Sequence, residues 1–381
     1  MWDYATTPPH VLQFDGLRGL LSLWVVVAHM LSWCGWVGLK FPWPLDRLWP
    51  EFIYSQPAVE AFIILSGFAI SSLLTKRPSY RAFILGRVFR LYPVYLVCLA
   101  VTIMATFVTP GVLARLSWRE SGYVHLLEEI SRYERENLSA HVIAHLTLLH
   151  GTLPQSILPG STTAILPPAW SLSLEWQYYL VAPLVAGLVR RGWGWLGLGI
   201  VSWVGVRIAA DWQSLTPAFL PVHLPLFLLG IGSHWAYSAA CRGGKADLDF
   251  SVPSAVIVVV AFVTSWHTYT LVIWALACGS VAASGRDPYS RLLRVVSRTL
   301  VSRPVQWLGS ISYPLFLVHW PAITFGLWSA LALRPNLTSR DAAAVLLGVV
   351  LPLTLIVAAV LHRFIELPGI EAGRRVPTKT Q

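Results

Sequence analysis

Ten separate apolar stretches dominate this sequence, and each is close to the length needed to cross a lipid bilayer. A transmembrane helix needs about 20 largely apolar residues to cross about 30 Å of hydrocarbon. The candidate stretches are residues 17–36, 58–74, 88–108, 170–188, 193–210, 218–236, 252–266, 268–283, 307–331 and 342–361. The fold class predicted is therefore all-α, a polytopic membrane bundle of about ten transmembrane helices.

The composition excludes a set of soluble domains. Charged residues make up 12% of the chain and hydrophobic residues 55%, whereas soluble domains carry about 25% charged residues. The 19 tryptophans agree with a membrane location, because indole favours the membrane–water interface. The four cysteines are far apart and form no C-x-x-C pair, so they indicate neither a zinc site nor a redox centre.

The basic residues predict how the helices are oriented. With ten crossings, eighteen of the 28 Lys and Arg residues fall on the side of the N-terminus and nine on the other side. The positive-inside rule places the richer side in the cytoplasm, so we expect both termini to be cytoplasmic. Counting residues 138–149 as an eleventh span would scatter the basic clusters, so we expect this stretch to be re-entrant or interfacial. The net charge of +10 then reflects topology, and nucleic acid is not an expected partner.

The domain organisation follows from these spans. We expect residues 1–370 to form a single transmembrane domain and residues 371–381 a cytoplasmic tail. Residues 109–168 form an extracytoplasmic loop that contains the re-entrant segment, and a loop of this length is more often a binding element than a spacer. His141, His145 and His150 lie in this loop, but H-E-x-x-H is absent, so no metal site is predicted.

Ionisable residues inside spans are costly, and each is a candidate site residue. Arg18 and His29 are eleven residues apart, so they share a helix face about 16 Å apart along the axis, and Asp15 lies on that face. In a functional interpretation, Arg18 binds an anionic group of a cytosolic ligand and His29 is a base at its far end. In a structural interpretation, Asp15 and Arg18 form an ion pair and His29 is an interhelical donor. The spacing alone leaves both open.

Further candidates lie in other spans. His319 enters its span at a depth near that expected for His29, with Tyr313 six residues before it. Glu175 lies one to two turns into the fourth span and needs a cation, a histidine or a hydroxyl-bearing ligand. Arg87 and Arg90 begin the third span, where two arginines one turn apart are suited to binding phosphates.

Five stretches, in order along nearly the whole chain, resemble acyltransferase family three of integral-membrane enzymes. They are FDGLRGLLSLWVVVAH (residues 14–29), AFIILSGFAIS (61–71), RAFILGRVFRLYPVY (81–95), AWSLSLEWQYYL (169–180) and ISYPLFLVHWP (311–321). The resemblance implies a ten-helix bundle that transfers an acyl group, commonly acetyl, from cytosolic acyl-CoA to a hydroxyl of a sugar or other acceptor.

The resemblance also implies roles for individual residues. His29 corresponds to the catalytic histidine and Arg18 to its essential partner. Trp176 stands where a second Glu often follows Glu175, which puts an acceptor role of paired carboxylates in doubt. The chain ends about twenty residues after its last predicted span, so it resembles the stand-alone form of the family.

These considerations give three groups of predicted site residues. They are His29, Glu175 and Asp15 as catalytic residues, Arg18, Arg87 and Arg90 as donor-binding residues, and His319, Tyr313 and Glu175 as acceptor-binding residues. Acetyl-CoA or another acyl-CoA is the expected co-substrate, without a metal. Direct transfer and an acyl-histidine intermediate both remain open.

The expected acceptor is a sugar of an exported polysaccharide or a lipid-linked glycan, and the expected surroundings are the lipids of a bacterial inner membrane. An alternative acceptor is a small secondary metabolite such as a macrolide. An alternative from another functional class is a proton-coupled transporter or flippase that uses His29, His319 and Glu175 as a relay.

Overall fold

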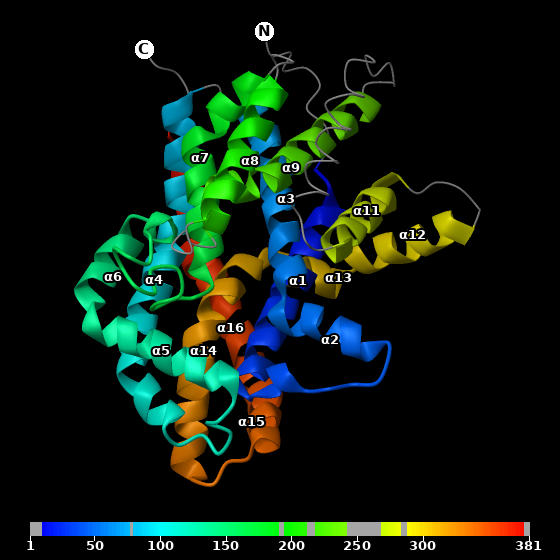
Figure 1. Ribbon diagram of the computed structural model, residues 1–381. Helices are drawn as coiled ribbons and strands as arrows, with labels where there is room; N and C mark the ends of the chain where they lie inside the picture. The colour runs from blue at the N-terminus through cyan, green and yellow to red at the C-terminus, as the bar shows by residue number, and fades with distance from the viewer. Residues whose placement is uncertain are drawn as a thin grey trace.

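The computed structural model describes residues 10–76, 79–189, 194–211, 218–241, 268–282 and 288–376. Within these ranges every regular element is a helix, as the sequence predicts (Figure 1). The elements up to residue 152 are α1 (Leu12–Trp33), η2 (Trp36–Gly38), α2 (Leu45–Tyr54), α3 (Gln56–Lys76), α4 (Tyr80–Leu113), α5 (Gly122–Glu136), α6 (Leu138–Leu146) and η3 (His150–Thr152).

The later elements begin with a group around the middle of the chain. They are α7 (Ala169–Val189), α8 (Gly194–Asp211), α9 (Leu220–Cys241), α11 (Thr268–Ala282), α12 (Pro288–Leu300) and α13 (Arg303–Ser310). The last elements are α14 (Ser312–Leu333), α15 (Ser339–Val345), η5 (Leu346–Val350), α16 (Leu351–Leu361), η6 (His362–Glu366) and α17 (Leu367–Arg374).

Six helical segments within the described ranges are long and apolar enough to cross a membrane. They are Leu12–Trp33, Gln56–Leu74, Tyr80–Leu113, Ala169–Val189, Ser312–Leu333 and Ser339–Arg374. The predicted spans at 193–210 and 268–283 correspond to the shorter apolar helices Leu196–Ile208 and Thr268–Ala282. The span predicted at 218–236 is helical as α9, and the one at 252–266 lies outside the described residues. A membrane helical bundle is thus confirmed, and the count of ten is not.

At two of the predicted stretches, the helices begin or end at clearly different residues. The stretch 307–331 is interrupted at Ile311, where the hydroxyls of Ser310 and Ser312 donate to the last carbonyls of α13. The stretch 342–361 continues as one helical segment to Arg374, through the π-helical turns η5 and η6. Its polar end remains helical because Glu366 is buried and paired with His362, with Nδ1 and Oε2 2.8 Å apart.

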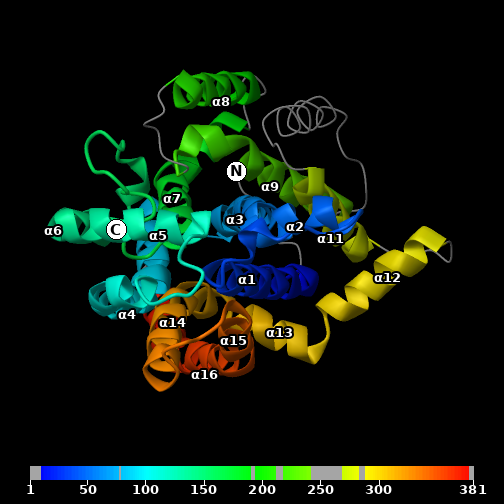
Figure 2. The same cartoon turned by 60° about the horizontal axis from the view of Figure 1, so that its bottom comes forward.

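Helices α1 and α3 lie in the middle of the bundle, between α14 and α16 on one side and α7 to α9 on the other (Figure 2). The segment formed by α13 and α14 packs along α1 and runs in the same direction. Gly19 lies against Gly309, where a Cβ on Gly19 would be 2.5 Å from the Gly309 nitrogen, so only glycine permits this approach. Ten residues further along each of these two segments, His29 meets His319. The two glycines therefore determine which residues of α14 face the histidine of α1.

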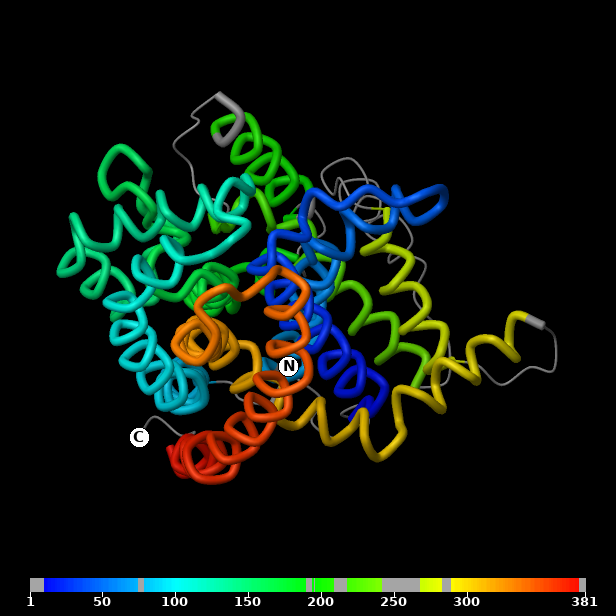
Figure 3. Tube along the Cα trace, turned by 90° about the horizontal axis from the view of Figure 1, so that it is seen from below, coloured from blue at the N-terminus to red at the C-terminus, as the bar shows by residue number. Residues whose placement is uncertain are grey.

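Segments that are far apart in the sequence meet at one end of the bundle. The indole of Trp118 donates to the Trp33 carbonyl at 2.9 Å, and the hydroxyl of Ser339 donates to the Cys34 carbonyl at 2.6 Å. Arg115 donates to the Leu331 carbonyl at 2.7 Å. At this end α1, the loop before α5, and the turn between α14 and α15 are therefore tied together, while α12 extends away from the bundle elsewhere (Figure 3).

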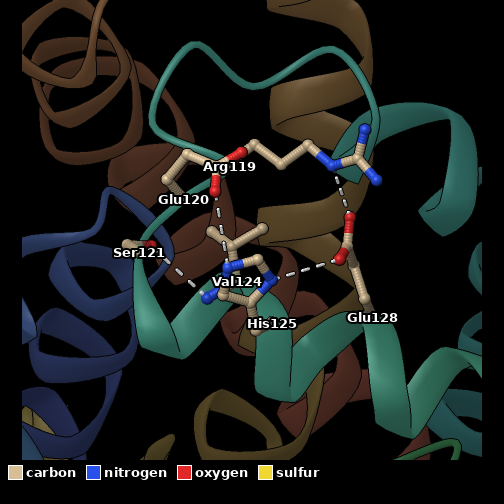
Figure 4. A network of polar contacts seen from close by, with 6 residues as sticks. All are labelled: Arg119, Glu120, Ser121, Val124, His125 and Glu128. Atoms are coloured by element: carbon tan, nitrogen blue, oxygen red, sulfur yellow. Dashed lines mark hydrogen bonds and ion pairs between the residues drawn. The ribbon is translucent and has the colours of Figure 1, made fainter.

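Helices α5 and α6 lie on the flank of the bundle beside α4 (Figure 1). Ser121 caps α5 by accepting from the Val124 amide, and Glu128 binds both Arg119 and His125 (Figure 4). The ion pair between Arg119 and Glu128 is exposed and contributes about 0–1 kcal/mol. The histidines of the predicted loop segment, His141, His145 and His150, are fully buried, and the rings of His145 and His150 stack with centroids 4.0 Å apart.

Glu134 joins α5 to the loop before α7: it is 5% exposed and accepts a hydrogen bond from the Ile165 amide at 2.8 Å. Burial raises the pKa of Glu134 from 4.5 to about 7. Because the folded state then favours the protonated acid, its stability falls as pH rises between about 4.5 and 7.

Replacing Glu134 with Gln is expected to remove this pH dependence. The amide keeps an oxygen for Ile165 but cannot ionise, so Glu134→Gln should raise the Tm by several degrees at pH 8 and leave it nearly unchanged at pH 5. The free-energy difference is on the order of 3 kcal/mol. Differential scanning fluorimetry in nanodiscs measures it, with the exposed Glu136→Gln as control. An equal Tm change at both pH values would contradict the assignment.

Candidate functional site

A cavity of about 150 Å³ lies among the helices at the centre of the bundle, and we call it the arginine cavity. Its walls come from α1, α3, α4, α7, α9 and α14. The polar residues that line it are Arg18, Ser66, Arg87, Arg90, Ser171, Glu175, Tyr179, Ser312 and Tyr313. The structure thus brings together all three predicted donor-binding residues, and it places Glu175 and Tyr313 with them.

The charges around the arginine cavity favour an anionic ligand. Three guanidinium groups face one carboxylate, that of Glu175. The hydroxyls of Ser66 and Tyr179 donate to the same oxygen of this carboxylate, so Glu175 is held by neutral donors. Because Glu175 is already hydrogen-bonded in this way, the three arginines retain capacity to bind phosphate or carboxylate groups of a ligand.

The arginines of α4 are positioned by the first turns of that helix. Ser79 caps α4 and Arg87 and Arg90 follow, one turn apart on the side that lines the cavity. The Arg87 guanidinium lies over the Tyr179 ring, 5.8 Å from its centroid. The buried Nε atom of Arg87 has no hydrogen-bond partner among the described residues, so it is free to bind a ligand.

His29 and His319 are joined by a hydrogen bond, with Nδ1 of His29 2.9 Å from Nε2 of His319. Nδ1 of His319 lies 3.2 Å from the carbonyl oxygen of Leu315, which can only accept. In a neutral pair, His319 therefore carries its proton on Nδ1 and accepts at Nε2 from Nδ1–H of His29. This leaves the lone pair of His29 on Nε2, so the pair presents a base.

An aromatic wall separates the arginine cavity from the histidine pair. Phe62 and Phe316 both line the cavity, and their ring centroids are 5.7 Å apart. On its other side Phe316 lies 6.2 Å from the His319 ring. The cavity therefore ends one aromatic layer from the histidines.

Two predicted residues have other contacts. Asp15 is paired with His10 at 3.3 Å, and its backbone carbonyl lies against Gly309, so it is not part of the cavity lining. Tyr313 donates to the Leu91 carbonyl at 2.6 Å, which fixes its hydroxyl between α14 and α4. The structure joins His319 directly to His29 and gives no direct contact between Glu175 and either histidine.

The sequence interpretation missed three residues of the site. The sequence marks Ser66 only as part of the stretch AFIILSGFAIS, whereas its hydroxyl donates to the carboxylate of Glu175. Tyr179 binds the same carboxylate from the next turn of α7, and the i,i+4 spacing of Glu175 and Tyr179 is the signal that could have indicated this pair. Phe316 was not distinguished from other apolar residues, and no local signal marks it.

Comparisons with known proteins give one matching family and several relatives. A family model described as an acyltransferase domain matches residues 11–363. The chain is 26% identical to Acyltransferase MdmB of Streptomyces mycarofaciens, over 98% of this chain and 96% of that protein. It is 24% identical to Peptidoglycan O-acetyltransferase OatA of Listeria monocytogenes, over 94% of this chain and 56% of that protein.

A third relative is Nodulation protein 10 of Rhizobium leguminosarum bv. viciae, which is 26% identical over 56% of this chain and 54% of that protein. The chain thus spans about half the length of two of these three relatives. No solved structure matches it. The six long apolar helices among the described residues, together with these relatives, make the chain an integral membrane protein.

Proposed function

The chain belongs to this acyltransferase family, and on that premise we propose that it transfers an acyl group, expected to be acetyl, from cytosolic acyl-CoA to a hydroxyl of a sugar. The sugar belongs to an exported polysaccharide or a lipid-linked glycan. The protein lies in the bacterial inner membrane with both termini in the cytoplasm. Family membership favours this enzyme over a transporter that would use the same histidines as a proton relay.

One observation carries the proposal: an arginine-lined cavity ends one aromatic layer from a histidine whose Nε2 is free to accept a proton. Acyl-CoA matches this arrangement, because its anionic phosphates are separated from its thioester by a flexible arm. Arg18, Arg87 and Arg90 bind the anionic part, and the arm passes Phe316 to bring the thioester to His29.

The chemistry then follows from the hydrogen bonds of the pair. His29 Nε2 removes the proton of the acceptor hydroxyl as the oxygen attacks the thioester carbonyl carbon. The carbon–sulfur bond breaks, the new ester forms, and the CoA sulfur takes the proton from His29. His319 orients His29 and stabilises the imidazolium by accepting from its Nδ1–H throughout.

Glu175 acts on the donor side in this account. Its carboxylate, fixed by Ser66 and Tyr179, lies among the arginines and limits the positive charge of the cavity when no donor is bound. In this proposal Glu175 acts on Arg18 and Arg87 through its charge and does not touch the reacting atoms.

The test has two arms. Purified protein in proteoliposomes is supplied with acetyl-CoA, and release of the free CoA thiol is measured with and without a glycan fraction from the source membrane. We expect thiol release that depends on the glycan fraction, whereas a transporter would release none. Mass spectrometry of envelope glycans and secreted products from a deletion strain then identifies which molecule loses acetyl groups.

A further inference from the structure

A second, smaller cavity of about 20 Å³ lies among α1, α4, α5 and α14. Its polar lining residues are Trp33, Ser131, Glu134, Trp320 and Thr324, together with three threonines of α4. We call it the tryptophan cavity. Its volume is that of about one water-sized group, so it admits a single hydroxyl.

Two residues of this lining carry buried polar atoms that lack a hydrogen-bond partner within the described ranges. They are the indole Nε1 of Trp33, a donor, and the hydroxyl of Ser131, a donor and an acceptor. Trp33 is 1% exposed and Ser131 is 2% exposed. Buried polar atoms of this kind are normally satisfied, so two of them on one cavity point to a missing polar group.

The remaining polar atoms of the tryptophan cavity are acceptors or neutral groups. Thr102, Thr106 and Thr109 donate to carbonyls of their own helix, which leaves their oxygens free to accept. Glu134 is the sole ionisable side chain among the residues described around this cavity, and Lys, Arg and His are absent from that lining. The cavity therefore favours a neutral hydroxyl group over an anion, in contrast to the arginine cavity.

The tryptophan cavity adjoins the histidine pair. The Trp320 ring lies 5.6 Å from the His29 ring on one side and 5.6 Å from the Trp33 ring on the other. Trp33 itself follows His29 by one turn of α1. A ligand with several hydroxyls could thus place one in the cavity and another at Nε2 of His29.

We propose that the tryptophan cavity is an anchoring subsite for the acceptor, in which Trp33 and Ser131 hydrogen-bond a non-reacting hydroxyl of a neutral polyol such as a hexose unit. This proposal rests on the function proposed above and deepens it. The acceptor binds with one hydroxyl at Trp33 and Ser131 and presents another to His29, while the donor approaches from the arginine cavity.

Binding of a simple neutral sugar tests the subsite without turnover. Saturation-transfer difference NMR is recorded for methyl β-glucoside with the purified full chain in nanodiscs, and with methyl glucuronide as its anionic counterpart. We expect the glucoside to bind more tightly than the glucuronide. Ser131→Ala and Trp33→Phe should each weaken glucoside binding about five- to tenfold, the value of one hydrogen bond.

Matched variants control for general damage. Ser117→Ala and Trp24→Phe remove a hydroxyl and an indole N–H that already donate to the Leu337 and Phe52 carbonyls, outside the cavity. They should leave glucoside binding unchanged. Equal binding by wild type, Ser131→Ala and Trp33→Phe would overturn the subsite and show that the cavity holds structural water only.

The same samples separate this proposal from the enzymatic one. Acyl-CoA thiol release is measured in wild type alongside the NMR experiment. If wild type releases thiol but Ser131→Ala and Trp33→Phe bind glucoside as wild type does, only the subsite is contradicted. If wild type releases no thiol, the proposed function is contradicted. Loss of binding in the variants with unchanged donor KM supports the subsite directly.

Discussion

Replacing His29 with alanine is expected to lower kcat for acyl transfer about 10²- to 10⁴-fold, the usual contribution of a positioned general base. The donor KM should change little, because His29 lies beyond the aromatic wall that ends the arginine cavity. Steady-state kinetics with labelled acetyl-CoA in proteoliposomes measures both constants. The α1 helix of the variant must still insert into the membrane. Size-exclusion chromatography of the purified variant checks that it is folded.

His319 provides a graded control for this prediction. In His319→Gln the side-chain oxygen can still accept a hydrogen bond from Nδ1–H of His29. In His319→Ala no side-chain acceptor remains. We therefore expect the Gln variant to retain clearly more activity than the Ala variant. If His29→Ala retains wild-type kcat, the base is elsewhere, and if both His319 variants are equally active, His319 does not position His29.

Reversing the charges of Arg87 and Arg90 is the second large effect expected. Three arginines and one glutamate give the lining of the arginine cavity a formal side-chain charge of +2, and the double change to Glu makes it −2. Loss of a buried charged partner costs about 2–5 kcal/mol. We expect the KM for acyl-CoA to rise on the order of 100-fold, with a smaller change in kcat.

A matched double variant distinguishes this effect from a change in overall charge. Arg374 and Arg375 are exposed and pair with Glu371, so reversing them alters the net charge equally without reaching the cavity. That variant should keep a donor KM near the wild-type value. A rise confined to the acceptor KM in the Arg87/Arg90 variant would contradict the placement of the donor.

The helical class and most helix positions could be predicted from the sequence because the length and apolarity of a segment are local properties. The break at Ile311 could not, since serine hydroxyls that bond the preceding carbonyls end α13 inside an apolar stretch. The continuation of the last helix to Arg374 was also missed, because His362 and Glu366 look like a polar terminus until their pairing is seen.

Most individual residues of the candidate site could be predicted from the sequence, but the contacts among them could not. The equal depths expected for His29 and His319 agree with their hydrogen bond, yet their contact depends on how Gly19 meets Gly309, which no local pattern indicates. Glu175 needed a partner, and the sequence could not choose among a cation, a histidine and a hydroxyl. The structure gives it the hydroxyls of Ser66 and Tyr179 in a cavity shared with arginines.

The most direct test of the account is transfer of a labelled acetyl group from acetyl-CoA by the purified protein in proteoliposomes that contain the glycan fraction. With wild type, the account predicts labelled ester in that fraction and one free CoA thiol for each acetyl group transferred. With His29→Ala, it predicts that both fall to about one hundredth of the wild-type rate or lower. Unchanged acetyl-CoA with wild type, or equal transfer by the variant, would contradict it.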